Sequence, residues 1–270
     1  MKRLVLLTLI MAVCCKGPEQ RSETEAASPQ SGQAAGSGTP APLPEENAAV
    51  PAQEIWIDSI EIANPLTVKG RARTFENAVS LRVRDSSGAI VAEEHVTSRG
   101  EMGRHNPYEA QLWITRDPGA SVTVEAFEFS ARDGSVQSLT SRSAGYDIDR
   151  IRATLIFPVG DCTRLDAFAR DVPKSVAMAR LLVEALLAGP IAVETAAGAS
   201  SPFPEGSDVL AVTLRDGEVT VDFNERLQNV GGSCAALAIR DSVTRTLMEL
   251  PTVKRVAIRA GGSESLALQP

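Results

Sequence analysis

The sequence predicts an all-β sandwich followed by a second, α+β domain, with a long polar segment before both. Three features support this prediction. Short apolar runs alternate with polar residues over residues 54–147, two helical patterns flank a hairpin pattern over residues 151–262, and Pro, Gly, Ser and Ala dominate residues 16–53. The part outside that polar stretch is long enough for two small domains.

Alternating apolar residues carry the prediction for the first domain. In "AVSLRVRD", the side chains of Val79, Leu81 and Val83 face one way and polar side chains face the other. The runs "IWIDSIEI", "AIVAEEHV", "YEAQLWIT" and "SVTVEAFEFS" repeat this pattern less regularly, and "DSSG" and "ARDGS" are typical of turns. Several short strands separated by turns indicate a β-sandwich.

Helical periodicity appears twice in the second domain. The stretch "DVPKSVAMARLLVEALLAGP" follows a strand, "RATLIFPV", and an expected loop; its apolar stripe begins at Val176 and ends before Gly189 and Pro190. The stretch "GGSCAALAIRDSVTRTLMELP" predicts another helix, with Ser233 as its N-cap. Both helices are expected on one face of a mostly antiparallel sheet.

A hairpin lies between the two predicted helices. In "DVLAVTLRDGEVTVDFN", two alternating runs flank Asp216 and Gly217, a residue pair that favours two-residue turns. The run "VKRVAIRA" closes the domain as a strand, and residues 263–270 form a tail. The expected element order is therefore βα-ββ-αβ.

The first fifteen residues are typical of an export signal. A basic start precedes the apolar run Leu4–Val13, which is too short to span a bilayer. The run ends on Cys14 and Cys15, as in bacterial lipoproteins, where a cysteine is acylated and becomes the new N-terminus. We predict a lipoprotein signal peptide over residues 1–15 with Cys15 as the lipidated residue; Cys14 and an ordinary signal peptide remain alternatives.

Residues 16–53 are expected to act as a disordered linker, because they carry too few large apolar side chains to offset the entropy of ordering. Together with the signal, this linker predicts an exported, membrane-anchored protein in the cell envelope. The anchor would be the N-terminal lipid, and the location the outer face of a bacterial membrane or the periplasm.

The remaining composition argues against several function classes. A net charge of −7 without a basic run argues against nucleic-acid binding. The two histidines, His95 and His105, stand apart from each other, and no zinc-type spacing, P-loop or Gly-x-Ser-x-Gly motif is present. The sequence therefore predicts no catalytic residues, no metal and no cofactor.

Cys162 and Cys234 both fall in the second domain. In a βα-ββ-αβ layout, the end of the first strand and the start of the second helix can lie at neighbouring ends of the sheet. An exported setting favours a disulfide between them. Two buried free thiols are the alternative.

Residues of the first domain resemble a known family. The stretch "NPLTVKGRARTFENAVSLRVRDSSGAIVAEEHVTS" is similar to the immunoglobulin-like domain found beside GerM-type domains in bacterial surface proteins. The matching positions are Pro65, Leu66, Val68, Gly70, Ala72, Phe75, Glu76, Arg132, Asp133 and Gly134. The resemblance implies an immunoglobulin-like sandwich.

Residues of the second domain resemble the GerM domain, named from a sporulation and germination protein. The motif "LLAGP", which ends on Gly189 and Pro190, matches this family. So does "LRDGEVTVDF", which contains Asp216, Gly217 and Asp222. For Asp222 we favour a structural hydrogen-bonding role over a chemical one.

The resemblance implies a non-catalytic module that binds an envelope protein or cell-wall material, with a link to sporulation, germination or envelope assembly. The alternative is a peptidoglycan-binding accessory protein or a cell-wall hydrolase. A small-molecule-binding lipoprotein is a third interpretation.

Overall fold

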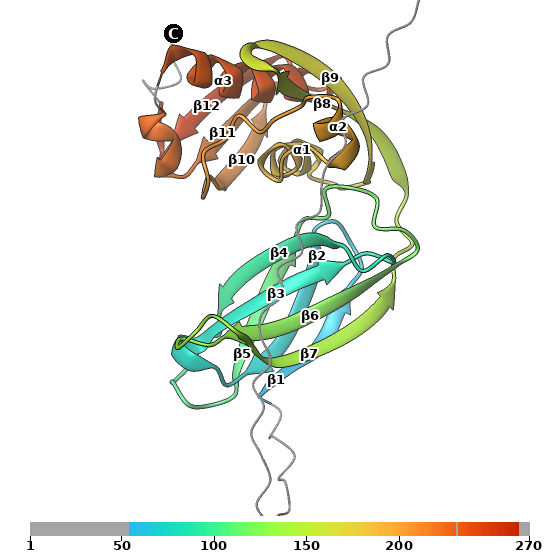
Figure 1. Cartoon of the computed structure of the whole chain (residues 1–270), viewed down its shortest axis with the longest axis vertical. Coiled ribbons are helices and arrows are strands. Elements are labelled where there is room, and N and C mark those ends of the chain that lie inside the picture. Colours follow the sequence, from blue (N-terminus) through green and yellow to red (C-terminus); the bar gives the residue numbers. More distant parts are fainter. Residues whose placement is uncertain (1–53, 231, 265–270) are drawn as a thin grey trace, which may run out of the picture. The chain divides into compact units, whose positions relative to one another are not determined.

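The computed structural model describes residues 54–230 and 232–264 (Figure 1). The described residues all belong to one compact unit. None of the helices in the described part is long and apolar enough to cross a membrane. The predicted signal peptide with Cys14 and Cys15, the whole of the predicted linker, and most of the predicted tail lie outside the described residues.

The first domain is a sandwich of two antiparallel sheets, drawn in blue to green in Figure 1. One sheet has the strand order β1-β2-β5 and the other the order β4-β3-β6-β7. These strands are β1 (Ile55–Glu61), β2 (Leu66–Ala72), β3 (Ala78–Arg84), β4 (Ile90–Thr97), β5 (Asn106–Leu112), β6 (Ser121–Phe129) and β7 (Val136–Gly145). A 3-10 helix, Phe75–Asn77, precedes β3. The predicted immunoglobulin-like sandwich is confirmed.

The core of this sandwich comes from the inward residues of both sheets. Val79, Leu81 and Val83 on β3 are fully buried, as their alternation predicts. The irregular alternation of β1 also has a structural cause, because its pairing with β2 shifts register between Ile57 and Ser59. That β-bulge turns the following side chains to the opposite face.

The second domain combines a strand pair, a four-stranded sheet and helices. Its elements are β8 (Arg150–Val159), β9 (Asp161–Pro173), α1 (Met178–Leu187), α2 (Ala192–Ala196), β10 (Val209–Arg215), β11 (Glu218–Phe223), α3 (Ser233–Met248), β12 (Arg255–Ala260) and β13 (Ser263–Glu264), with a 3-10 helix over Glu225–Asn229. The sheet order is β10-β11-β12-β13, and β11 and β12 run parallel. The α+β class is confirmed.

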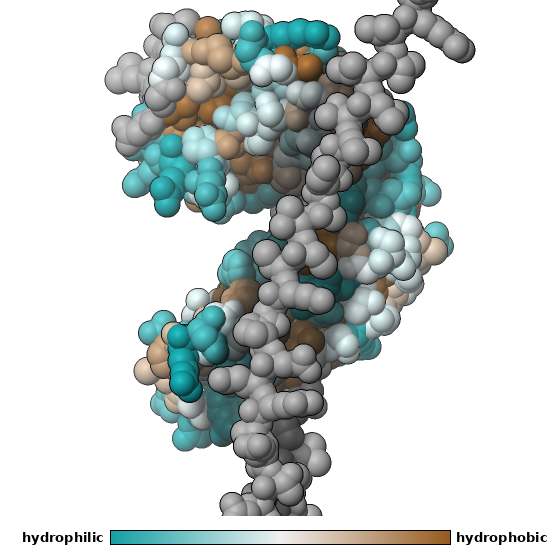
Figure 2. All heavy atoms as spheres, in the orientation of Figure 1, coloured by the Kyte–Doolittle hydropathy of each residue, from teal (hydrophilic) through white to brown (hydrophobic). Residues whose placement is uncertain are grey.

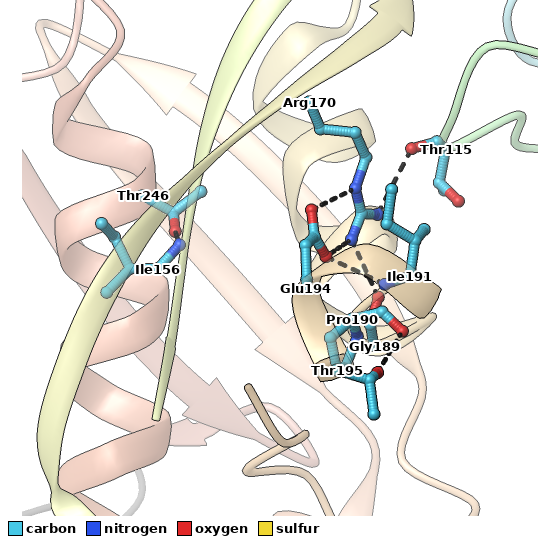
Figure 3. Close-up of polar contacts among 9 residues, drawn as sticks. All are labelled: Thr115, Ile156, Arg170, Gly189, Pro190, Ile191, Glu194, Thr195 and Thr246. Atoms are coloured by element: carbon cyan, nitrogen blue, oxygen red, sulfur yellow. Dashed lines mark hydrogen bonds and ion pairs between the residues drawn. The ribbon is translucent and has the colours of Figure 1, made fainter. Parts of the chain in front are cut away.

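Apolar residues of α1 and α3 share one core with β8 and the inner face of the sheet. Leu182 and Leu186 on α1 and Ile239 and Val243 on α3 are buried there. The backbone N–H of Ile156 on β8 also donates a 3.0 Å hydrogen bond to Oγ1 of Thr246 on α3 (Figure 3). This bond satisfies a buried polar pair and joins the helix to the strand pair.

Several elements differ from the prediction. Strand β9 occupies the expected loop after β8, because a turn at Gly160, with φ of 76°, returns the chain along β8. Helix α1 begins only at Met178, so Val176 precedes the helix and is fully exposed instead of joining the stripe. The short helix α2 lies in the expected loop, and Gly232, not Ser233, is the N-cap of α3.

Candidate functional site

The two histidines lie in the first domain, on or beside different strands. His95 lies on β4, and His105 lies just before β5 with its ring edge-on to Trp56. Within residues 54–230 and 232–264, no group of three or more His, Cys, Asp or Glu side chains is placed to hold a metal ion. The carboxylate nearest to His105 is Glu54, at 3.5 Å, and Arg73 already binds that carboxylate.

Ser80 and His95 form a serine–histidine contact that the sequence analysis did not identify. The Ser80 hydroxyl lies 2.9 Å from Nδ1 of His95, and the two residues face each other across β3 and β4. A serine nucleophile also needs a third group that orients the imidazole and a cleft for substrate. In the described part of the chain His95 has no ion pair with a carboxylate and Ser80 is buried, so this is a cross-strand hydrogen bond.

Cys162 and Cys234 are joined by a disulfide, as predicted. It links the start of β9 to the first turn of α3, with a Cα–Cα distance of 5.6 Å. That distance lies in the ordinary range for a disulfide. The bond closes a loop that contains both α1 and the β10–β11 hairpin.

Arg170 and Glu194 form a buried ion pair between β9 and α2 (Figure 3). The exposed fractions of their side chains are 2% and 4%. Nε and Nη2 of Arg170 donate to the two carboxylate oxygens of Glu194, and Nη2 also donates to the Gly189 carbonyl at 3.1 Å. Glu194 additionally accepts the Ile191 N–H at 2.9 Å, which closes the first turn of α2.

This cluster reaches the first domain, since Nη1 of Arg170 lies 3.5 Å from the Thr115 carbonyl (Figure 3). Asn64 strengthens the same junction: its Nδ2 donates to the carbonyls of Ile114 and Pro173, each at 3.1 Å. Because every charged atom in the Arg170–Glu194 pair is buried and bonded to protein, the cluster is structural and offers no group to a ligand.

A surface depression with a volume of about 990 Å³ lies in the second domain. It is lined by the loop before β10, by the 3-10 helix after β11 and by the first turn of α3. The lining residues are Pro202, Phe203, Pro204, Glu205, Asn224, Glu225, Arg226, Gln228, Val230 and Ala235. We call this depression the Phe203 groove. Hydrophilic and hydrophobic residues are interspersed on the face of this domain drawn in Figure 2.

Asn224 and Gln228 are held in place at the groove by backbone carbonyls. Nδ2 of Asn224 donates to the Gly206 carbonyl at 2.8 Å, and Nε2 of Gln228 donates to the Ala260 carbonyl at 3.0 Å. The Oδ1 atom of Asn224 is buried without a hydrogen-bond donor. Phe203 is half-buried, and its ring packs 5.8 Å from that of Phe223. The groove therefore has a fixed apolar wall and oriented amides.

The motif residues of the first domain have separate structural positions. A side chain at Gly70 would collide with the Trp56 carbonyl and the Tyr108 ring, so only glycine fits on β2 there. Phe75 is exposed, and Glu76 has a positive φ of 53° in the 3-10 helix.

Arg132, Asp133 and Gly134 lie in the turn between β6 and β7. The Ser135 hydroxyl donates to the carboxylate of Asp133 at 2.7 Å and lowers the pKa of that carboxyl. These residues form the turn of the β6–β7 hairpin. No pocket described for residues 54–230 and 232–264 brings them together with Phe75 or Glu76.

The motif residues of the second domain also serve the fold. Gly189, with φ of 78°, follows the end of α1 and precedes Pro190. Asp216 and Gly217 both have positive φ, 51° and 80°, as a two-residue hairpin turn requires. Oδ1 of Asp222 accepts the Gly262 N–H at 3.0 Å. None of these residues lines the Phe203 groove.

Sequence reasoning missed the groove and the role of Glu194. A glutamate three residues after the start of a short helix, as in "IAVE", is a capping signal that could have identified α2 and Glu194. The groove residues come from three segments without a common motif. Only the folded chain brings them together.

Both domains match known families. Residues 57–135 match the family described as "Immunoglobulin-like domain of bacterial spore germination". Residues 157–266 match the family described as "Sporulation and spore germination". No curated protein matches the chain.

Two solved structures are similar to part of the chain. The tandem GerMN domains of the sporulation protein GerM from Bacillus subtilis are 20% identical over 43% of this chain and 41% of that one, with a TM-score of 0.36. The chain thus spans about two fifths of that protein. The first GerMN domain of the same protein is 24% identical over 42% of this chain and 85% of that one, with a TM-score of 0.36. The two family matches thus cover separate parts of the chain, an immunoglobulin-like domain of bacterial spore germination over residues 57–135 and a sporulation and spore germination domain over residues 157–266.

Proposed function

We propose that this protein is a membrane-anchored lipoprotein of the bacterial cell envelope and acts there as a non-catalytic interaction module in sporulation, germination or envelope assembly. Its partner would be an envelope protein or cell-wall material. The observation that carries the proposal is the Phe203 groove, an open site whose polar side chains are oriented for binding without a nucleophile beside a base.

The disulfide supports the proposed location. Disulfides persist in oxidising compartments outside the cytoplasm, and Cys162–Cys234 joins two elements of the folded core. The anchor itself rests on the sequence at Cys15, with Cys14 as the alternative acylation site. Both domain families belong to spore germination, which favours a role in that process.

Metabolic labelling with a palmitate analogue tests the anchor. The wild-type chain should be labelled and sediment with membranes, and Cys15→Ser should lose both properties while Cys14→Ser keeps them. The reverse pattern would move the anchor to Cys14. If labelling survives in both variants, the lipoprotein assignment is wrong.

Crosslinking in the native cell, followed by identification of the captured molecule, tests the interaction role. The expected product is an envelope protein or a wall fragment, and capture of cytoplasmic proteins alone would contradict the proposal. A turbidity assay on purified sacculi tests the non-catalytic part. Sedimentation with sacculi without clearing is the expected result for a wall partner, whereas clearing would establish a hydrolase.

A further inference from the structure

The Phe203 groove has the size and composition of a site for an elongated polar ligand. Its volume of about 990 Å³ lies at the upper end of the range for small-molecule sites. Pro202, Phe203 and Pro204 supply an apolar wall, and the two proline rings restrict the backbone on either side of the phenylalanine. A ligand that fills the groove must therefore offer at least one apolar ring face and extend well beyond it.

The polar atoms of the groove have unused bonding capacity. Gln228 lines the groove with an exposed side chain, and its Nε2 already donates to the Ala260 carbonyl, which leaves the charged side chains as the groups free to bind a ligand. Arg226 has no ion pair or side-chain hydrogen bond with any other described residue, although its guanidinium offers five N–H donors. Glu205 and Glu225 are also unpaired within the described part.

Arg226 is placed to reach across the groove. It comes from the 3-10 helix, yet a Cβ placed on Gly206 in the opposite loop would lie 3.5 Å from its Nε. The guanidinium therefore lies beside the loop that carries Glu205 and Phe203. The guanidinium of Arg226 and the carboxylates of Glu205 and Glu225 thus line the same depression, and the guanidinium lies beside the loop that contains Gly206.

These charges select among ligand classes. A purely apolar ligand would cover Arg226, Glu205 and Glu225 without giving these charged groups partners. A polyphosphate, such as a nucleic acid or a teichoic acid, would meet two carboxylates and only one guanidinium. A ligand that carries both carboxylates and an ammonium group, together with amides and hydroxyls, satisfies the whole lining.

We propose that the Phe203 groove binds a peptidoglycan glycopeptide, an amino-sugar disaccharide with an attached stem peptide. An apolar sugar face packs on Phe203 and its flanking prolines, and a stem-peptide carboxylate forms a bidentate pair with Arg226. The stem-peptide ammonium pairs with Glu205 or Glu225, both of which are exposed at the groove. This inference rests on the proposed interaction role and names the ligand for it.

Titration calorimetry with a purified disaccharide tetrapeptide tests the proposal on the full chain in detergent. Arg226→Ala should weaken binding about tenfold, the usual value of one well-formed charged pair. Arg245→Ala is the matched control, because Arg245 is exposed on α3 and outside the groove. A glycopeptide with amidated carboxylates should bind the wild-type chain about tenfold more weakly and lose nothing further on Arg226→Ala.

The outcomes separate this inference from the proposed function. Equal binding to the wild-type chain and Arg226→Ala would overturn the groove assignment. A lack of glycopeptide binding, together with capture of an envelope protein by crosslinking in the cell, would overturn the ligand and leave the interaction role intact. Tighter binding of purified teichoic acid than of glycopeptide would also overturn the ligand class.

Discussion

Replacement of Glu194 by alanine should destabilise the protein more than any exposed substitution. The change removes three acceptor contacts, two from Arg170 and one from the Ile191 N–H. It leaves a guanidinium with an exposed fraction of 2%, bonded only to the carbonyls of Gly189 and Thr115. The Arg170 charge is then buried without a counter-ion.

The expected cost is about 3–5 kcal/mol, the range for removal of one partner from a buried pair. An exposed pair between β8 and β9, which includes the residue next to Arg170, provides the matched control. Arg152 and Asp171 are 3.1 Å apart, with exposed fractions of 65% and 52%. Asp171→Ala should therefore cost less than about 1 kcal/mol.

Urea unfolding followed by tryptophan fluorescence gives both free energies, because Trp113 packs against the core of the second domain. The double replacement Arg170→Met with Glu194→Leu should recover most of the loss, since no buried charge remains. If Glu194→Ala costs no more than Asp171→Ala, the pair does not stabilise the fold in the way argued. The reasoning would also be contradicted if the double replacement lowered the free energy of unfolding more than Glu194→Ala does.

Three further results are expected. Replacement of both Cys162 and Cys234 by serine should cost roughly 4 kcal/mol in the chain-entropy model, seen as a lower calorimetric Tm; an unchanged Tm would refute this. Burial raises the pKa of Glu184 above 4.5, so the folded state keeps that proton to higher pH than the unfolded state; stability from this group is present at low pH and lost as pH rises above about 4.5. Glu184→Gln should flatten that part of the urea-unfolding profile against pH, and an unchanged profile would contradict the assignment. Gly217→Ala should cost about 1–2 kcal/mol in the same unfolding assay, because φ is 80° and the new Cβ would lie 3.1 Å from Lys254 Cδ; a neutral effect would refute the strained-turn argument.

The sequence predicted elements whose periodicity is local. Strand β3 reads as a strand because Val79, Leu81 and Val83 alternate with polar residues, and the hairpin around Asp216 has a two-residue turn signal. Strand β9 was missed because its stability comes from pairing with β8, and its own residues are mostly polar or small. Tertiary pairing decided its conformation.

The Phe203 groove was less predictable than the fold, because it also depends on contacts between segments that are distant in the sequence. The motif residues Gly70 and Asp222 are required by the fold, because a side chain at Gly70 would clash with its neighbours and Asp222 accepts a backbone N–H. Such residues identify the fold but do not point to a ligand. The groove depends on Phe203 in the loop before β10 and on Asn224 and Arg226 at the 3-10 helix after β11, so its two sides are separated in the sequence by the whole β10–β11 hairpin. These residues come together because the β10–β11 hairpin and α3 bring their segments into contact. Composition and sequence spacing do not specify where the hairpin and the helix lie.

The disulfide also determines how the protein responds to proteolysis. Residues 204–206 form an exposed stretch between Cys162 and Cys234, inside the covalent loop. A single cut there would leave both fragments linked through the two sulfur atoms. The cut chain would migrate as one species on a non-reducing gel and as two on a reducing gel, so a cut in this stretch would not release the part of the second domain that follows it.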